Sequence, residues 1–142
     1  MFNGSWVPGD TAGGCRNYLE TFAMNPQYRI SVTDPDDDDE DNLCTVIVSV
    51  MQKGRRAMRD EGGGCLTIGF ALYHVPSEAE ASDHLDTDFF KYNKSVGRSR
   101  AFINLRENSA RFRLPPGNYC IVPSTFKPGE WQNNISISIV RT

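Results

Sequence analysis

The sequence predicts an all-β domain, built as an antiparallel β-sandwich of about eight short strands. Several segments alternate between apolar and polar residues with the period of two that a half-buried strand requires. Prolines and glycines typical of turns separate these segments, and no stretch carries an apolar stripe at helical spacing. A length of 142 residues suits a single domain with a two-layer core.

The first half of the chain contains three strand patterns. In the first, Tyr28, Ile30 and Val32 alternate with polar neighbours until an acidic stretch begins. Residues 43–51 are rich in β-branched side chains, which suits a central strand of a sandwich. Residues 66–75 form the third pattern, and a proline follows it.

The second half of the chain predicts further strands, divided by two turns that contain proline and glycine. Residues 77–88 hold alanines among acids without a helical stripe, so we expect a loop there. The first 26 residues show no lasting periodicity and are interpreted as an entry segment or linker. The expected strands are residues 101–105, 110–114, 118–123 and 134–140.

Charge is distributed unevenly along the chain. The formal net charge is −3, from 15 Lys and Arg against 18 Asp and Glu. Seven of the 18 acids fall within residues 34–41, the acidic segment, where only Pro35 interrupts them. Without those seven, 11 acids face 15 basic residues, a formal charge of +4. The body of the domain is therefore mildly basic and one loop is strongly acidic, and such local potential governs what a surface attracts.

The cysteine and histidine content predicts a non-catalytic, cytoplasmic chain. The four cysteines form no C-x-x-C pair, and no apolar N-terminal run resembles a secretion signal. Only His74 and His84 could act as a base for a cysteine nucleophile, and neither lies in a catalytic pattern. The Cys and His spacings match no zinc motif. No apolar run approaches the roughly 20 residues that a membrane span requires.

The acidic segment has three interpretations. Clustered carboxylates supply the oxygen ligands that calcium prefers, but the spacing is not that of an EF-hand loop, so such a site would be open and weak. Alternatively, the charges attract lysines or arginines of another domain, and calcium would compete with that contact. The third interpretation is a solvated loop without a partner. The candidate residues are Asp34, Asp36, Asp37, Asp38, Asp39, Glu40 and Asp41.

A second candidate site is the basic segment, residues 53–59, which suits contact with anionic phospholipid headgroups. Each basic group near an anionic membrane contributes about 1 kcal/mol, so four give weak, reversible attraction. A solubilising loop is the competing interpretation. If residues 43–51 form one strand, a rise of about 3.3 Å per residue separates the two segments by roughly 30 Å. The candidate residues are Lys53, Arg55, Arg56 and Arg59.

Nucleic acid is not an expected partner. The acidic segment offsets the basic residues of the chain. The aromatic residues in the strand patterns occupy positions typical of a core rather than of a stacking platform. They are Phe70, Phe102, Phe112 and Tyr119.

Local strings spread over most of the chain carry a family resemblance. They are TAGGCRN at 11–17, TF at 21–22, MNPQY at 24–28, TIGF at 67–70 with Tyr73, FINLRE at 102–107, RF at 111–112, LPPG at 114–117 with Tyr119, and VPSTF at 122–126. In this order they resemble domain III of the large subunit of calpains, the calcium-dependent intracellular cysteine proteases. The resemblance implies a C2-like β-sandwich, which agrees with the strand count.

The resemblance also implies roles within a longer protein. Residues 1–14 would be the tail of the protease core and a linker, and residues 15–142 the C2-like domain. The family's catalytic residues lie outside this chain, so Cys15 is not the nucleophile. The acidic segment would bind calcium weakly and contact lysines of the protease core in the same polypeptide. An EF-hand domain would be a further neighbour.

We therefore predict a regulatory module that couples calcium to activation of a cysteine protease core through the acidic segment. One alternative is a calcium-modulated module that targets phospholipid membranes through the basic segment. The other is a structural spacer between domains, for which neutralising either segment leaves the calcium requirement of the protease unchanged.

Overall fold

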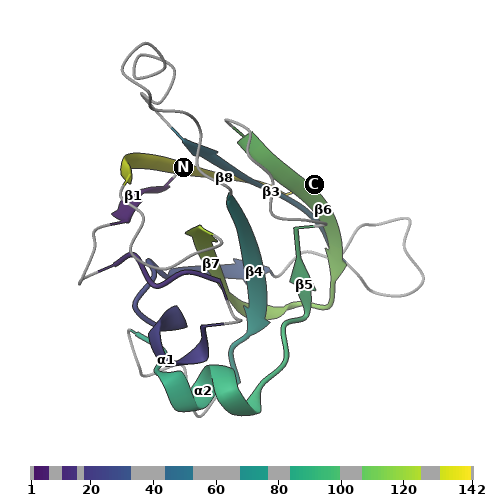
Figure 1. The fold of residues 1–142 in the computed structure, drawn as a ribbon. Helices are drawn as coiled ribbons and strands as arrows, with labels where there is room; N and C mark the ends of the chain where they lie inside the picture. Colours follow the sequence, from purple (N-terminus) through teal and green to yellow (C-terminus); the bar gives the residue numbers. More distant parts are fainter. Residues whose placement is uncertain are drawn as a thin grey trace.

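The computed structural model describes residues 2–6, 11–15, 18–32, 44–52, 68–76, 84–99, 107–125 and 132–141. Within them, eight strands form two four-stranded sheets in which every pairing is antiparallel (Figure 1). The all-β sandwich predicted from the sequence is confirmed. The expected strand at residues 101–105 lies outside the described residues.

Sheet A has the strand order β1-β8-β3-β6. Its central strand β3 pairs with β6 from Cys44↔Leu114 to Met51↔Glu107, and with β8 on its other side. Val46, Val48 and Val50 of β3 all point into the core and are 0% exposed, as their alternation predicts. The strands are β1 (Phe2–Trp6), β3 (Cys44–Gln52), β6 (Glu107–Leu114) and β8 (Gln132–Arg141).

Sheet B has the strand order β2-β7-β4-β5. Strand β7 is buried from Tyr119 to Thr125, on both of its faces. A strand buried on both faces has a further layer on its outer side, because alternate side chains point in opposite directions. The strands are β2 (Tyr28–Val32), β4 (Ile68–His74), β5 (Gly97–Arg98) and β7 (Gly117–Thr125).

The main core lies between the two sheets. It combines the valines of β3 with Ile135 and Ile137 of β8, and with Ile68, Phe70 and Leu72 of β4. Tyr119 belongs to this core, and Phe112 packs against its edge. The core role predicted for Phe70, Phe112 and Tyr119 is therefore confirmed, while Phe102 lies outside the described residues.

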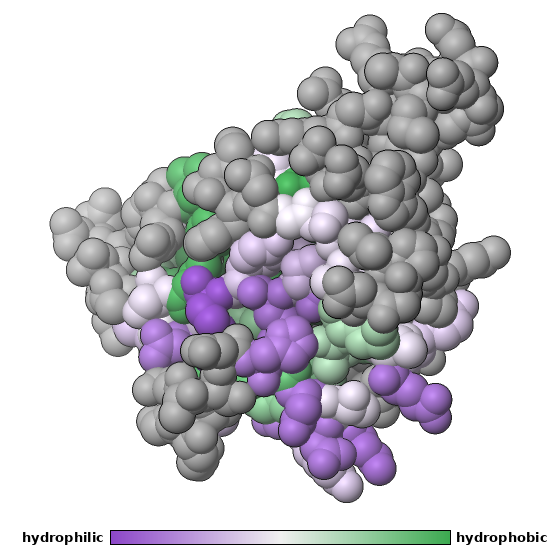
Figure 2. Space-filling view, turned by 90° about the vertical axis from the view of Figure 1, so that its left-hand side faces the viewer, coloured by the Kyte–Doolittle hydropathy of each residue, from purple (hydrophilic) through white to green (hydrophobic). Residues whose placement is uncertain are grey.

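Two short helices cover the outer face of sheet B, although the sequence shows no apolar stripe at helical spacing, and the second begins inside the loop expected at residues 77–88. They are α1 (Leu19–Phe22) and α2 (Thr87–Tyr92). Phe22 and Phe90 pack edge-to-face on each other, and Phe90 packs in the same way on Tyr73 of β4, with ring centroids 5.0 and 4.8 Å apart. The face seen in Figure 2 is mostly hydrophilic in its lower part, because this aromatic cluster is buried.

Strand β1 is the second departure from the sequence interpretation, which placed an entry segment there. Phe2, Asn3 and Gly4 pair with β8, and Trp6 is 0% exposed. The indole Nε1 of Trp6 donates to the carbonyl of Pro123 in β7, 3.2 Å away, so it joins the two sheets. The assignment of residues 1–14 to a preceding domain of a longer protein stays a prediction.

Candidate functional site

The side chains of both predicted sites lie outside the described residues. This holds for all seven acids of the acidic segment and for Lys53, Arg55, Arg56 and Arg59. The structure does describe the residues at which each segment joins the sandwich. Those junctions fix the position of the two segments in the fold.

The acidic segment joins the two sheets. Val32, which precedes it, ends β2 in sheet B and pairs with Gly117. Cys44, which follows it, begins β3 in sheet A and pairs with Leu114. Both residues are buried, at 1% and 2% exposure. The described residues on either side of the acidic segment are therefore held in the core, one in each sheet.

The connection between β6 and β7 crosses between the sheets at this same end. Only two prolines separate Leu114 from Gly117. The hydroxyl of Tyr119 donates to the carbonyl of Pro115 over 2.5 Å, which fixes this turn. Burial raises the pKa of Tyr119, with a smaller contribution from Cys44, so the phenol stays a neutral donor. His74, at the end of β4, packs edge-to-face on Tyr119 with ring centroids 5.5 Å apart.

The basic segment joins the sandwich at the opposite end of β3. Gln52 ends β3 beside Ile135, and Ile68 begins β4 beside Thr125. Strand β3 covers nine residues, so a rise of about 3.3 Å per residue places the two junctions roughly 30 Å apart. The predicted strand between the segments is confirmed with a shift of one residue.

Among the described residues, no group of three or more His, Cys, Asp or Glu side chains could hold a metal ion. The carboxylates of the acidic segment lie outside that part of the chain, and as a set of hard oxygen donors they fit calcium in ligand type. In the same described part, no helix is long and apolar enough to cross a membrane.

Comparison with known proteins decides the family. The model for the family "Calpain large subunit, domain III" matches residues 2–134. The chain belongs to this family. Calpain-B of Drosophila melanogaster is 59% identical over 130 residues, which cover 92% of this chain and 14% of Calpain-B. Human Calpain-9 is 53% identical over 128 residues, which cover 90% of this chain and 18% of Calpain-9.

This calpain domain III therefore spans less than a fifth of the length of these relatives. Among solved structures, the pre-peptidase C-terminal domain of a collagenase from Bacillus anthracis overlaps with a TM-score of 0.49 at 15% identity. That overlap covers 96% of this chain and 86% of the other. No functional inference follows from it.

The described cysteines of domain III are buried thiols. Cys15, Cys44 and Cys120 form no disulfide and are at most 2% exposed. Burial raises the pKa of the Cys120 thiol to about 11, although Arg29 acts in the opposite direction. A neutral, buried thiol is a poor nucleophile. Cys65, the fourth cysteine, lies outside the described residues.

A buried polar cluster surrounds Asn25, which is 0% exposed, and it was not predicted from the sequence. Its Oδ1 accepts from the amide of Gly13 at 3.0 Å, and its Nδ2 donates to the carbonyl of Gly14 at 2.8 Å. A Cβ atom on Gly13 would lie 2.0 Å from the carbonyl oxygen of Thr21. The glycine pair and Asn25 thus form one unit that holds residues 11–15 against α1.

A group of exposed side chains begins in the last turn of α2 and continues into β5, and it was not predicted from the sequence. Tyr92 is 76% exposed and Val96 is 48% exposed, and the three basic residues near them are exposed as well. We define Lys91, Tyr92, Lys94, Val96 and Arg98 as the tyrosine–lysine strip. Its residues carry no motif, so only the exposure of Tyr92 and Val96 reveals it.

Proposed function

We propose that this domain III is a non-catalytic regulatory module of a calcium-dependent cysteine protease, and that its acidic segment makes an electrostatic contact with the protease core that calcium weakens. One observation carries the proposal. The described residues that flank the seven-acid segment are buried in the core, Val32 in one sheet and Cys44 in the other. A strongly charged loop is thereby presented from a fixed end of the domain.

Anchoring supports a contact role through entropy. A loop whose two ends are buried in a packed core has fewer conformations to lose on docking than a free tail has. Tyr119 adds to this rigidity, because its hydrogen bond to Pro115 fixes the turn beside both anchors. Docking onto basic side chains therefore costs the acidic segment less conformational entropy than it would cost an equally charged segment at a chain terminus.

Charge density supports a basic partner. Seven acids in eight positions repel one another, and a cluster of lysines or arginines relieves that repulsion. In the proposal these basic residues belong to the protease core of the same polypeptide. Calpain-B and Calpain-9 are several times longer than this chain, which leaves ample sequence for such a core.

Calcium supplies positive charge when it is bound to the carboxylates. The segment then loses much of the attraction that holds it against the basic residues of the core, and the equilibrium shifts toward the undocked arrangement. In this proposal the acidic residues contact the basic residues of the core when calcium is absent, and they bind calcium when it is present. Phospholipid contact at the basic segment would be a separate property, because its junctions lie roughly 30 Å away along β3.

Calorimetric titration of the chain with calcium chloride tests the direct-binding part of the proposal. We expect measurable heat below millimolar calcium and a rise in the melting temperature. At ten times Kd the stabilisation is about 1.4 kcal/mol. The double substitution Asp37→Asn/Asp39→Asn should weaken binding, and the matched surface pair Glu20→Gln/Asp88→Asn should leave it unchanged. Absence of both heat and stabilisation up to millimolar calcium would remove direct calcium binding from the account.

A further inference from the structure

We propose that the tyrosine–lysine strip is a docking surface for an acidic polypeptide segment that carries at least one apolar side chain. The strip presents Lys91, Lys94 and Arg98, and residues 89–99 contain no acid. Between the three cations lie Tyr92 and Val96, with 76% and 48% of their surfaces exposed. This proposal is independent of the acidic segment and of calcium.

The backbone beneath the strip is fixed, so the exposed side chains project from a rigid base. Helix α2 is capped by Asp86, whose Oδ1 accepts from the amide of Phe89 at 2.9 Å. At the other end of α2, the side chain of Asn93 donates to the carbonyl of Phe89 at 2.9 Å. The buried ring of Phe90 holds the helix against sheet B.

The second half of the strip is attached to sheet B. The amide of Val96 donates to the carbonyl of Leu72 at 2.8 Å, and Arg98 pairs with Ala71 across β5 and β4. Gly97 allows close approach, because a Cβ there would lie 2.8 Å from the ring of Phe112. A pre-organised surface of this kind loses little entropy when a partner binds.

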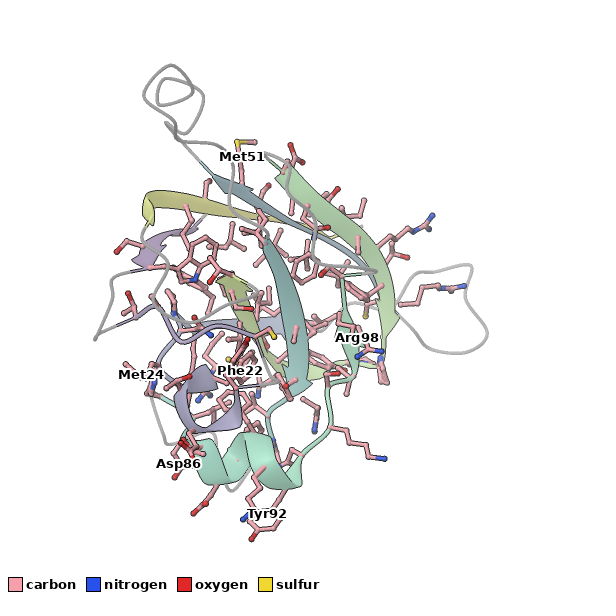
Figure 3. The ribbon with its side chains drawn as sticks, viewed as in Figure 1. Phe22, Met24, Met51, Asp86, Tyr92 and Arg98 are labelled. Carbon is pink, nitrogen blue, oxygen red and sulfur yellow. The ribbon has the colours of Figure 1, made fainter. Side chains whose placement is uncertain are left out.

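Position in the fold makes the strip accessible. Figure 3 shows Tyr92 pointing away from the body at the lower end of the molecule, with Asp86 at the other end of α2 and Met51 at the far end of the sandwich. The Nζ atom of Lys91 lies 5.4 Å from the centroid of the Tyr92 ring. This cation–π contact orients the ring and leaves the ammonium group exposed.

The three cations of the strip favour an acidic partner. The positions of nearby carboxylates favour a peptide over a membrane. Exposed Asp86 caps the same helix and exposed Asp88 lies in its first turn. At a rise of 1.5 Å per residue they lie about 9 Å and about 6 Å from Tyr92 along the helix axis. A flat anionic membrane over α2 would meet these carboxylates. A narrow acidic segment can run along Lys94 and Arg98, which follow Tyr92 in the chain whereas Asp86 and Asp88 precede it, and it can place an apolar side chain on Tyr92.

The test is fluorescence anisotropy with a labelled peptide of alternating Glu and Leu residues, titrated with the intact chain at low and at physiological salt. We expect saturable binding that weakens at higher salt. The double substitution Lys94→Ser/Arg98→Ser should weaken it at least about tenfold. The charge-matched pair Arg111→Ser/Arg113→Ser, on β6 of sheet A, should change it less than about twofold. Each variant should retain the wild-type melting temperature, because the replaced side chains are exposed.

Tyr92 provides a readout that involves no change of net charge. Tyr92→Ala should weaken peptide binding about fivefold or more, and Tyr92→Phe should retain it. Absence of saturable binding would overturn the proposal. Equal weakening by Lys94→Ser/Arg98→Ser and by Arg111→Ser/Arg113→Ser would also overturn it. Sedimentation with phosphatidylserine vesicles tests a membrane as the alternative partner. If Lys94→Ser/Arg98→Ser abolishes vesicle binding and leaves peptide binding intact, the surface binds a membrane and the proposal is wrong.

Discussion

Val32 and Cys44, the buried residues that bracket the acidic segment, pair with Gly117 and Leu114, which only Pro115 and Pro116 separate. Cross-strand partners lie about 5 Å apart, and three residues of chain span at most about 11 Å. The two junctions are therefore within about 20 Å of each other, on opposite sheets. The chain therefore leaves the described part of the sandwich before the acidic segment and re-enters it afterwards at the same end.

Trp6 should be essential to the stability of the domain, although sequence alone assigns its segment to a linker. Its indole is 0% exposed and bonds to Pro123 across the two sheets. We expect Trp6→Ala to lower the free energy of unfolding by about 3–5 kcal/mol in urea denaturation. Tyr92→Ala, at a 76% exposed site, should cost no more than about 0.5 kcal/mol. A cost below 1 kcal/mol for Trp6→Ala would show that β1 does not unfold with the domain.

Asn25 should contribute more stability than its size suggests. Its side chain bonds to Gly13, Gly14 and Phe22, and its loss leaves buried backbone groups without partners. We expect Asn25→Ala to destabilise the domain by about 2–4 kcal/mol, at about 1–3 kcal/mol per unsatisfied group. Asn93→Ala removes one exposed side-chain bond and should cost about 1 kcal/mol or less. Urea denaturation of both variants compares them, and equal costs would contradict the role of the cluster.

Cys120 should make the domain less stable in alkali. The pKa of its thiol is raised by burial from 9.0 to about 11. Between these values the unfolded chain releases a proton that the folded chain keeps, so unfolding is favoured as the pH rises. From this group alone we expect a loss of about 1 kcal/mol between pH 8 and pH 10. Urea denaturation at several pH values should show a shallower decline for Cys120→Ala, and an unchanged decline would refute the assignment.

In Cys120→Ala, we expect the remaining loss of stability at alkaline pH to come from two buried tyrosines. Burial also raises the pKa of Tyr28 and of Tyr119. Both phenols therefore keep their protons in the folded state to higher pH than in the unfolded chain, with the same sign as Cys120. The comparison between wild type and Cys120→Ala removes this shared contribution.

The sequence predicts long strands well and short elements poorly. β3 and β8 reveal themselves because Val46, Val48 and Val50, or Ile135 and Ile137, repeat on the face that becomes the core. Helix α2 covers six residues, fewer than two turns, so no helical period can be read from it. Its formation depends on the Asp86 cap and on the burial of Phe90 against Tyr73, which are a local and a tertiary contact.

β1 shows a different limit. Its sequence, FNGSW, holds a glycine and an asparagine that disfavour strands. It becomes a strand because β8 offers hydrogen-bond partners and because Trp6 fits between the sheets. The tyrosine–lysine strip could not be predicted for a similar reason, since exposure of Tyr92 depends on which face of α2 packs. The acidic segment, in contrast, is evident from composition alone. The positions of its flanking residues Val32 and Cys44 in two different sheets are known only from the structure.

The central claim is tested most directly by the calcium dependence of proteolysis in a full-length calpain that carries this domain. The acidic-segment variant replaces five aspartates by Asn and Glu40 by Gln; the aspartates are Asp36, Asp37, Asp38, Asp39 and Asp41. The control variant replaces the four basic residues Lys53, Arg55, Arg56 and Arg59 by Ser. The calcium concentration for half-maximal activity is measured for both. Coupling of about 1–3 kcal/mol predicts that the acidic-segment variant needs at least about fivefold less calcium, and that the control is unchanged. An unaltered calcium requirement in the acidic-segment variant would contradict the account and make the domain a spacer.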